Sequence, residues 1–233
     1  MMQKWGPEAI RFMRTASEYG TYHEQLAQIL MKWVPNDGHI CDAGCGLGDL
    51  SLALAKRCRE VTAVDRAEAP LEVLRERCNY SNVRIHCADL MSFLPSQPYD
   101  AMVFCYFGKL PQILQIAKSQ CHGKVILVKR NCAHQRFSIG QPEGHTDIAD
   151  TTESYLNTLG IPYEKELLSL ELGQPFTSLE DAVGFFKLYD KSGSEITPEM
   201  IAPRLISTGR EDYPLYLPEQ RRMGIFVLNA QDI

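Results

Sequence analysis

The feature that most constrains this chain is a regular alternation of short apolar segments with helical segments between residues 39 and 129. The apolar segments cover residues 39–43, 60–65, 83–87, 99–106 and 123–129. Helical patterns lie between them at residues 49–59, 70–78 and 110–120. Consecutive strands joined by helices pair in parallel, and the helices then cover both faces of the sheet. The alternation therefore predicts a doubly wound α/β fold.

The segments on either side of this alternation predict the rest of the organisation. Residues 7–31 carry apolar side chains at helical spacing with a break near Tyr19-Gly20, which indicates two helices. After the fifth strand we expect a helix at 147–159, a strand at 163–172 and a final antiparallel strand at 222–229. We therefore predict one domain over residues 1–233, with an N-terminal helical cover (1–35), an α/β core (36–173 and 223–233) and a helical insertion or lid (174–222).

The composition excludes several classes of protein. Of 233 residues, 45% are hydrophobic and 23% charged, as in ordinary globular proteins. No apolar run reaches the length of about 18 residues that a membrane helix needs, and no secretory leader is visible. The eight cysteines show no C-x-x-C pair, which favours reduced thiols in the cytoplasm. The net charge of −5 and the scattered basic residues disfavour a nucleic-acid partner without excluding one.

The chemistry of the chain is concentrated where the first strand runs into a glycine loop. The sequence from His39 to Asp49 is HICDAGCGLGD, a strand followed by glycines at 44, 46 and 48 and then by a helix. Glycines allow a tight turn and close approach of a ligand, and the helix start offers free N–H groups. A dinucleotide-binding loop has the spacing G-x-G-x-x-G, but Asp49 occupies the third glycine position here. The acid Asp42 before the loop also suits a cationic ligand better than a pyrophosphate.

The loop Asp42-Ala43-Gly44-Cys45-Gly46-Leu47-Gly48 resembles the first motif of the class I S-adenosylmethionine-dependent methyltransferases. Three further segments match in order and spacing. Val61-Thr62-Ala63-Val64-Asp65 resembles the second strand of that family, and Cys87-Ala88-Asp89-Leu90 resembles its acidic segment after the third strand. Residues 99–106 resemble its fourth strand, whose end lies near the methionine part of the cofactor and the substrate. The resemblance covers about residues 19–131 and the closing strand at 223–229. It implies a Rossmann-like fold and S-adenosylmethionine as the cofactor.

The resemblance also implies roles for individual residues. Asp42 would meet the amino group of the methyl donor, Asp65 would accept hydrogen bonds from the two ribose hydroxyls, and Asp89 would accept one from the adenine amine. Each acid has a structural alternative: a helix cap for Asp42, a turn acid for Asp65 and a solvated loop residue for Asp89. The full set of predicted cofactor-binding residues is Asp42, Gly44, Cys45, Gly46, Gly48, Asp65, Arg66, Asp89, Leu90 and Tyr106.

The substrate side is predicted from position alone. Ligands of open α/β sheets bind outside the carboxyl ends of the strands, which points to Phe107 and Arg130, and the N-terminal helices offer Tyr19 and Tyr22. His134 and His145, on the loop after the fifth strand, are weaker candidates for a base. The aromatic group Phe176, Phe185, Phe186 and Tyr189 is better explained as the small core of the insertion. No acid stands at 129 or 130, so no metal is expected.

These observations predict methyl transfer to a small-molecule acceptor. One alternative is a protein that binds the same cofactor but serves as a sensor or assembly partner, because no catalytic base is evident. A less favoured alternative is an NAD-linked oxidoreductase. The segment Cys105-Tyr106-Phe107-Gly108 replaces the Asn/Asp-Pro-Pro-Tyr segment of amino-methylating DNA enzymes, which disfavours that class. The pattern leaves the acceptor atom and the oligomeric state open.

Overall fold

A computed structural model describes residues 5–131, 137, 148–190, 193 and 195–233. The chain divides into two compact units. The large unit contains residues 23–131, 147–168 and 222–233, and the small unit contains residues 1–22, 132–146 and 169–221. The predicted single domain with an insertion at 174–222 remains a prediction, but the small unit also takes in residues from the N-terminus.

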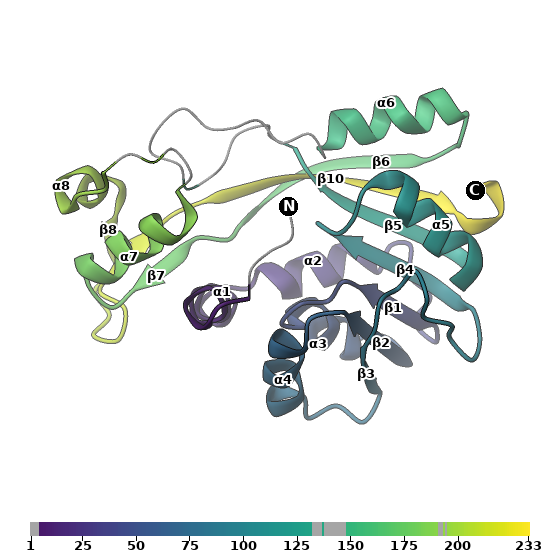
Figure 1. The fold of residues 1–233 in the computed structure, drawn as a ribbon, viewed down its shortest axis with the longest axis horizontal. Coiled ribbons are helices and arrows are strands. Elements are labelled where there is room, and N and C mark those ends of the chain that lie inside the picture. The colour runs from purple at the N-terminus through teal and green to yellow at the C-terminus, as the bar shows by residue number, and fades with distance from the viewer. Residues whose placement is uncertain (1–4, 132–136, 138–147, 191–192, 194) are drawn as a thin grey trace. The chain divides into compact units, whose positions relative to one another are not determined.

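The large unit is built on a seven-stranded sheet with the order β3-β2-β1-β4-β5-β10-β6 (Figure 1). Strands β1 to β5 are parallel to one another, and β10 runs antiparallel to β5. This arrangement confirms the predicted Rossmann-like fold. The strands are β1 (His39–Ala43), β2 (Glu60–Asp65), β3 (Val83–Cys87), β4 (Tyr99–Cys105), β5 (Cys121–Arg130), β6 (Glu164–Glu171) and β10 (Gln220–Asn229).

Helices pack against both faces of this sheet, as the alternation predicts. The helices are α2 (Tyr22–Leu30), α3 (Asp49–Ala55), α4 (Glu68–Arg77), α5 (Leu110–Gln120) and α6 (Ala149–Leu159), and the chain ends in η2 (Ala230–Asp232). Ile113 of α5 and Leu156 of α6 share a buried cluster with Phe104 and Leu127 of the sheet. On the opposite face, Leu71 and Leu74 of α4 pack against Ala63. Successive strand residues alternate between the two faces, which explains why central strands are apolar throughout.

The observed elements differ from the predicted ones mainly at helix ends. The helix after the glycine loop was expected to reach residue 59 but ends at Ala55. Arg57 explains the early end, because its side chain donates to the carbonyl of Ala53 at 2.7 Å and its N–H donates to the carbonyl of Leu54. Helix α4 begins two residues earlier than predicted, with Pro70 still in the first turn, where its missing N–H needs no partner.

The small unit combines helices with a sheet that the sequence did not predict. Its elements are α1 (Pro7–Tyr19), β7 (Gln174–Phe176), α7 (Leu179–Tyr189), α8 (Pro198–Ile201), η1 (Ala202–Arg204), β8 (Ile206–Ser207) and β9 (Leu215–Leu217). The three strands form an antiparallel sheet with the order β7-β9-β8. Phe12, Phe176, Phe185 and Phe186 are buried together. The aromatic group of the predicted insertion is thus core, as expected.

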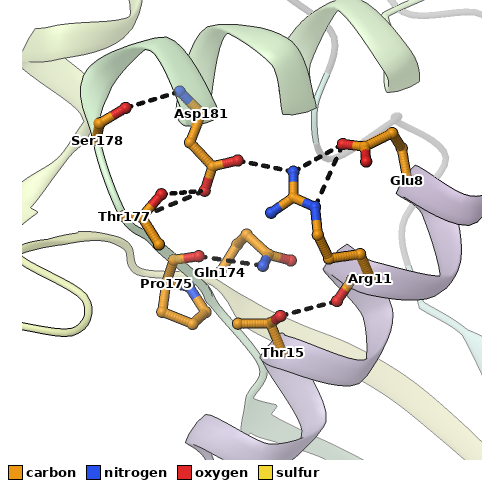
Figure 2. A network of polar contacts seen from close by, with 8 residues as sticks. All are labelled: Glu8, Arg11, Thr15, Gln174, Pro175, Thr177, Ser178 and Asp181. Carbon is orange, nitrogen blue, oxygen red and sulfur yellow. Dashed lines mark hydrogen bonds and ion pairs between the residues drawn. The ribbon is translucent and has the colours of Figure 1, made fainter.

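A polar network joins α1 to α7 inside the small unit (Figure 2). The Arg11 guanidinium lies between two carboxylates and donates to Glu8 at 2.8 Å and to Asp181 at 2.7 Å. Asp181 also accepts from the N–H and hydroxyl of Thr177, while Ser178 caps α7 by accepting the N–H of Asp181. The N-terminal helix is therefore tied to a segment some 170 residues away.

Two further observations bear on the sequence predictions. Among the described residues, no helix combines the length and apolar character needed to cross a membrane. Cysteines 41, 45, 58, 78, 87, 105 and 121 are free thiols.

Candidate functional site

The glycine loop is a left-handed turn between β1 and α3. Gly44, Gly46 and Gly48 have φ angles of +75°, +54° and +74°, in a region that residues other than glycine rarely adopt. The N–H groups of Gly44 and Cys45 both donate to the carbonyl of Val64, at 2.8 and 3.1 Å, so the turn is held against β2. A Cβ at position 44 would clash with the Phe107 ring, so this glycine is also required by close packing.

Asp42 is a buried acid just before this turn. Its side chain is 2% exposed and accepts a 2.6 Å hydrogen bond from the Ser51 hydroxyl in the first turn of α3. Burial raises the pKa of Asp42 to about 6, helped by the nearby Asp65 charge and opposed by hydrogen bonds from Ser51. Asp42 thus stabilises the start of α3, which is in keeping with the helix-capping role given above as its structural alternative. A buried carboxyl with a raised pKa is also poised to gain from a cationic partner.

Asp65 joins the end of β2 to the glycine turn. Its Oδ2 accepts the N–H of Gly46 and its Oδ1 accepts the N–H of Ala67, both at 2.9 Å. Each carboxylate oxygen has two lone pairs, so both retain the capacity to accept a further hydrogen bond. The carboxylate is therefore oriented by two backbone donors with both oxygens able to meet a vicinal diol.

Asp89 lies beyond the end of β3, the strand next to β2. Asp65 is in register with Cys87, and the N–H of Ala88 donates to the carbonyl of Asp65 at 2.9 Å, so the two acid-bearing segments are adjacent. The Asp89 side chain is exposed, and its Oδ1 accepts the N–H of Met91 at 2.9 Å. Leu90 is buried in the core, whereas the Arg66 side chain is exposed.

The segment after β4 forms a second unusual turn. Tyr106 has φ +54°, a strained conformation for a residue with a side chain, and Gly108 follows with φ +62°. The Tyr106 hydroxyl lies 3.7 Å from the sulfur of Met223, and the Arg130 guanidinium lies 5.9 Å from the centre of its ring. Phe107, between the two left-handed residues, packs against the Gly44 turn. The structure therefore brings Tyr106 and Arg130 together.

Lys129 is a residue that the sequence analysis did not select. Although it is a charged residue, Lys129 is only 1% exposed. Its ammonium donates to the carbonyls of Gly108 at 2.9 Å and Phe107 at 3.3 Å. Lys129 therefore stabilises the turn after β4 by binding two of its backbone carbonyls. The signal available in the sequence was its place at the end of a strand buried on both faces, where a charged side chain needs a specific partner.

The remaining predicted substrate residues belong to the small unit. Tyr19 stacks on Tyr216 with ring centres 5.1 Å apart and meets Tyr213 edge to face at 6.0 Å. Tyr22 is buried, with the Arg221 guanidinium 5.9 Å from its ring. Each has an evident packing role there. His134 and His145 lie outside the described residues.

The residues at the carboxyl edge of β1, β2 and β3 form a set suited to an adenosyl amino acid. Because these strands are parallel and in register, Asp42, the glycine turn, Asp65 and the Asp89 loop lie along one edge of one sheet. Carboxylates accept hydrogen bonds from ammonium, hydroxyl and amine groups. Among the residues that the structure describes, no cluster of histidine, cysteine and acid side chains could hold a metal ion.

Comparison with known proteins agrees with this geometry. Residues 40–123, from β1 to the start of β5, match a family model described as a methyltransferase domain. A malonyl-[acyl-carrier protein] O-methyltransferase from Acetivibrio thermocellus is 28% identical over 142 residues, which cover 55% of this chain and 50% of that protein. A 23S rRNA (uracil(1939)-C(5))-methyltransferase from Alkalilimnicola ehrlichii is 43% identical over 63 residues, 26% of this chain and 14% of that protein.

A solved structure shows the same fold. The YcgJ protein from Bacillus subtilis superposes with a TM-score of 0.56 at 13% sequence identity, covering 90% of this chain and 99% of that one. The chain spans about half the length or less of the two curated relatives named above. The range matched by the family model, residues 40–123, includes the glycine turn and the strand-end acids.

Proposed function

We propose that this chain, which belongs to the class I S-adenosylmethionine-dependent methyltransferases, binds the methyl donor along the carboxyl edge of β1 to β3 and transfers its methyl group to a small-molecule acceptor. The observation that carries the proposal is the double anchoring of Asp65. One of its oxygens is held by the glycine turn and the other by the chain after β2. The Asp65 carboxylate is therefore oriented in advance to accept hydrogen bonds from two neighbouring ribose hydroxyls.

The other two acids would complete recognition. Asp42 would face the amino group, where the positive charge offsets the unfavourable burial of its carboxylate. Asp89 would accept from the adenine amine with the capacity left after its bond to Met91. When bound, S-adenosylmethionine supplies a methyl group activated by the sulfonium charge. Chain residues would contribute mainly by aligning the acceptor in line with it, and a base is needed only where the acceptor enters protonated.

Two observations support a small-molecule acceptor over a nucleic acid. The net charge of −5 gives no indication of a broad basic surface, and the turn after β4 contains the aromatic residues Tyr106 and Phe107, which suit a compact ligand better than a phosphate backbone. One relative does methylate an oxygen and another acts on ribosomal RNA. A panel of labelled-methyl transfer assays with small acids, phenols and ribosomal RNA would separate these acceptor classes. Donor binding with no transfer to any member would favour the sensor alternative.

The donor-binding part is tested by calorimetry with S-adenosylmethionine and S-adenosylhomocysteine. Asp65→Ala should weaken S-adenosylhomocysteine binding by about 100-fold, because two charge-assisted hydrogen bonds of about 1.5 kcal/mol each are lost. Asp100→Ala is the matched control. Asp100 lies at the start of β4, on the opposite edge of the sheet, where it accepts the N–H of His39 at 2.6 Å. Heat from neither ligand with folded wild-type protein would refute the proposal.

A further inference from the structure

The loop that carries Asp89 is fastened to the protein by one buried side chain. Gln120 is the last residue of α5 and is 1% exposed. Its Nε2 donates to the carbonyl of Leu90 at 2.6 Å and to the carbonyl of Phe93 at 2.9 Å. Both hydrogens of a single amide nitrogen are therefore used on the two ends of a four-residue segment.

The same segment is also held by hydrogen bonds from its own N–H groups to Asp89. The N–H groups of Ser92 and Phe93 donate to the Asp89 carbonyl at 3.0 and 2.8 Å, and the N–H of Met91 donates to the Asp89 carboxylate. The loop is thus a compact turn in which the Asp89 side chain is exposed and the carbonyls of Leu90 and Phe93 bind the Gln120 amide. A shift of that amide would move the turn as a unit.

The buried position of Gln120 indicates that a glutamine is present there for the hydrogen bonds that its amide donates, and not for the apolar packing that it provides. The Gln120 Oε1 is buried and has no hydrogen-bond partner among the described residues. An unpaired buried oxygen destabilises the fold by about 1–3 kcal/mol. An apolar side chain of the same shape would avoid that cost, but it would leave the carbonyls of Leu90 and Phe93 without this donor.

We propose that Gln120 is a positioning residue for adenine recognition: it holds the β3–β4 loop so that the Asp89 carboxylate meets the exocyclic amine of the cofactor. This inference rests on the proposed binding of S-adenosylmethionine. Gln120 acts through the loop backbone. Its effect should therefore appear as a loss of discrimination between purine bases, in addition to any loss of stability.

The test uses a pair of ligands that differ only at the base. S-Adenosylhomocysteine carries the amine, and S-inosylhomocysteine carries a carbonyl oxygen in its place. Wild-type protein should prefer the adenosyl compound, because the inosyl oxygen would face a carboxylate. In Gln120→Met, we expect the preference measured by calorimetry to fall by about tenfold, the worth of one well-placed hydrogen bond to a charged group.

Two control variants distinguish positioning from general destabilisation. Gln174 of β7 is also a buried glutamine, 3% exposed, and its amide donates to the carbonyl of Pro175 at 3.2 Å. Gln174→Met should leave the base preference unchanged even where it lowers the melting temperature. Asp89→Asn should itself remove most of the preference, and adding Gln120→Met to it should lower the preference no further, because both act on one contact.

The outcomes separate the two proposals. Wild-type protein that binds neither ligand would overturn both. Wild-type binding with an unchanged base preference in Gln120→Met would overturn the role of Gln120 and leave donor binding intact. If the methionine variant does not fold, Gln120→Asn, which keeps the amide but withdraws it from the two carbonyls, is judged by the same criterion: a reduced preference supports the inference and an unchanged one overturns it.

Discussion

The carboxyl edge of the large unit and the core of the small unit are organised in opposite ways. At the edge, polar groups are arranged by backbone hydrogen bonds: the glycine turn is left-handed, and Asp65 and Asp89 each accept backbone N–H groups. In the small unit, Phe12, Phe176 and Phe185 come from distant parts of the chain and are held by packing. The comparison indicates that ligand affinity and stability depend on different residues, which mutations can test.

The largest expected effect is on the stability of the small unit. Phe185 is 2% exposed and its ring lies 5.0 Å from that of Phe12 and 5.4 Å from that of Phe176. Phe185→Ala should lower the local unfolding free energy by about 3–5 kcal/mol, because it leaves a cavity among rings that cannot fully collapse. Hydrogen exchange of the α7 and β7 amides measures this directly.

The matched control for that variant is an exposed aromatic residue. Tyr155 on α6 is 41% exposed, so Tyr155→Ala should change stability by no more than about 0.5 kcal/mol. Unchanged exchange in α7 of the Phe185 variant would show that the aromatic cluster does not stabilise the small unit. A large loss of S-adenosylhomocysteine affinity in the same variant would contradict the separation of roles drawn above.

The next effect concerns the pH dependence of binding at Asp42. Its pKa of about 6 means that the carboxyl is largely protonated at pH 5. An amino group at this site favours the charged form, so affinity for S-adenosylhomocysteine should fall about tenfold per pH unit below 6 and be constant above 7. Calorimetry between pH 5 and 8 measures this. Adenosine, which lacks the amino group, should show no such dependence, and neither should the Asp42→Asn variant.

Stability should follow the opposite trend at the same residue. The pKa of Asp42 in the folded protein lies above its ordinary value of 3.8, so ionisation is disfavoured by folding. The contribution of this group to stability is therefore full below pH 4 and is lost as the pH rises through 6. Urea unfolding of wild type and Asp42→Asn over this range isolates the contribution. Parallel trends of affinity and stability would contradict the assignment of Asp42 to the ligand amino group.

The smallest effect is expected at the network in Figure 2. The Arg11 side chain is 42% exposed, so its bonds to Glu8 and Asp181 are screened by solvent. Arg11→Met should lower the unfolding free energy by about 1 kcal/mol or less, and less still at high salt. Arg14→Met is the control, because Arg14 pairs with Glu18 within α1 itself. Equal losses in the two variants would show that linking α1 to α7 adds nothing to stability.

Several features of this protein follow from the sequence alone. Strands at 39–43, 60–65 and 83–87 and the helix at 110–120 have the predicted bounds, because apolar periodicity and turn residues act over short distances. The resemblance to methyltransferases was also predicted from the glycine loop and the two strand-end acids, and a methyltransferase-domain model matches residues 40–123. The roles of individual site residues stay predictions.

Other features were decided only by the tertiary structure. Strand β7 pairs with β9, and Gln120 binds the carbonyls of Leu90 and Phe93, so both contacts join residues far apart in the chain. Lys129 is buried because distant parts of the chain cover it. The sequence shows that a glutamine or lysine is present, but not which carbonyls lie within its reach. Local patterns determine which elements form. Long-range packing decides which polar side chains are desolvated, and each of those must then find a specific partner.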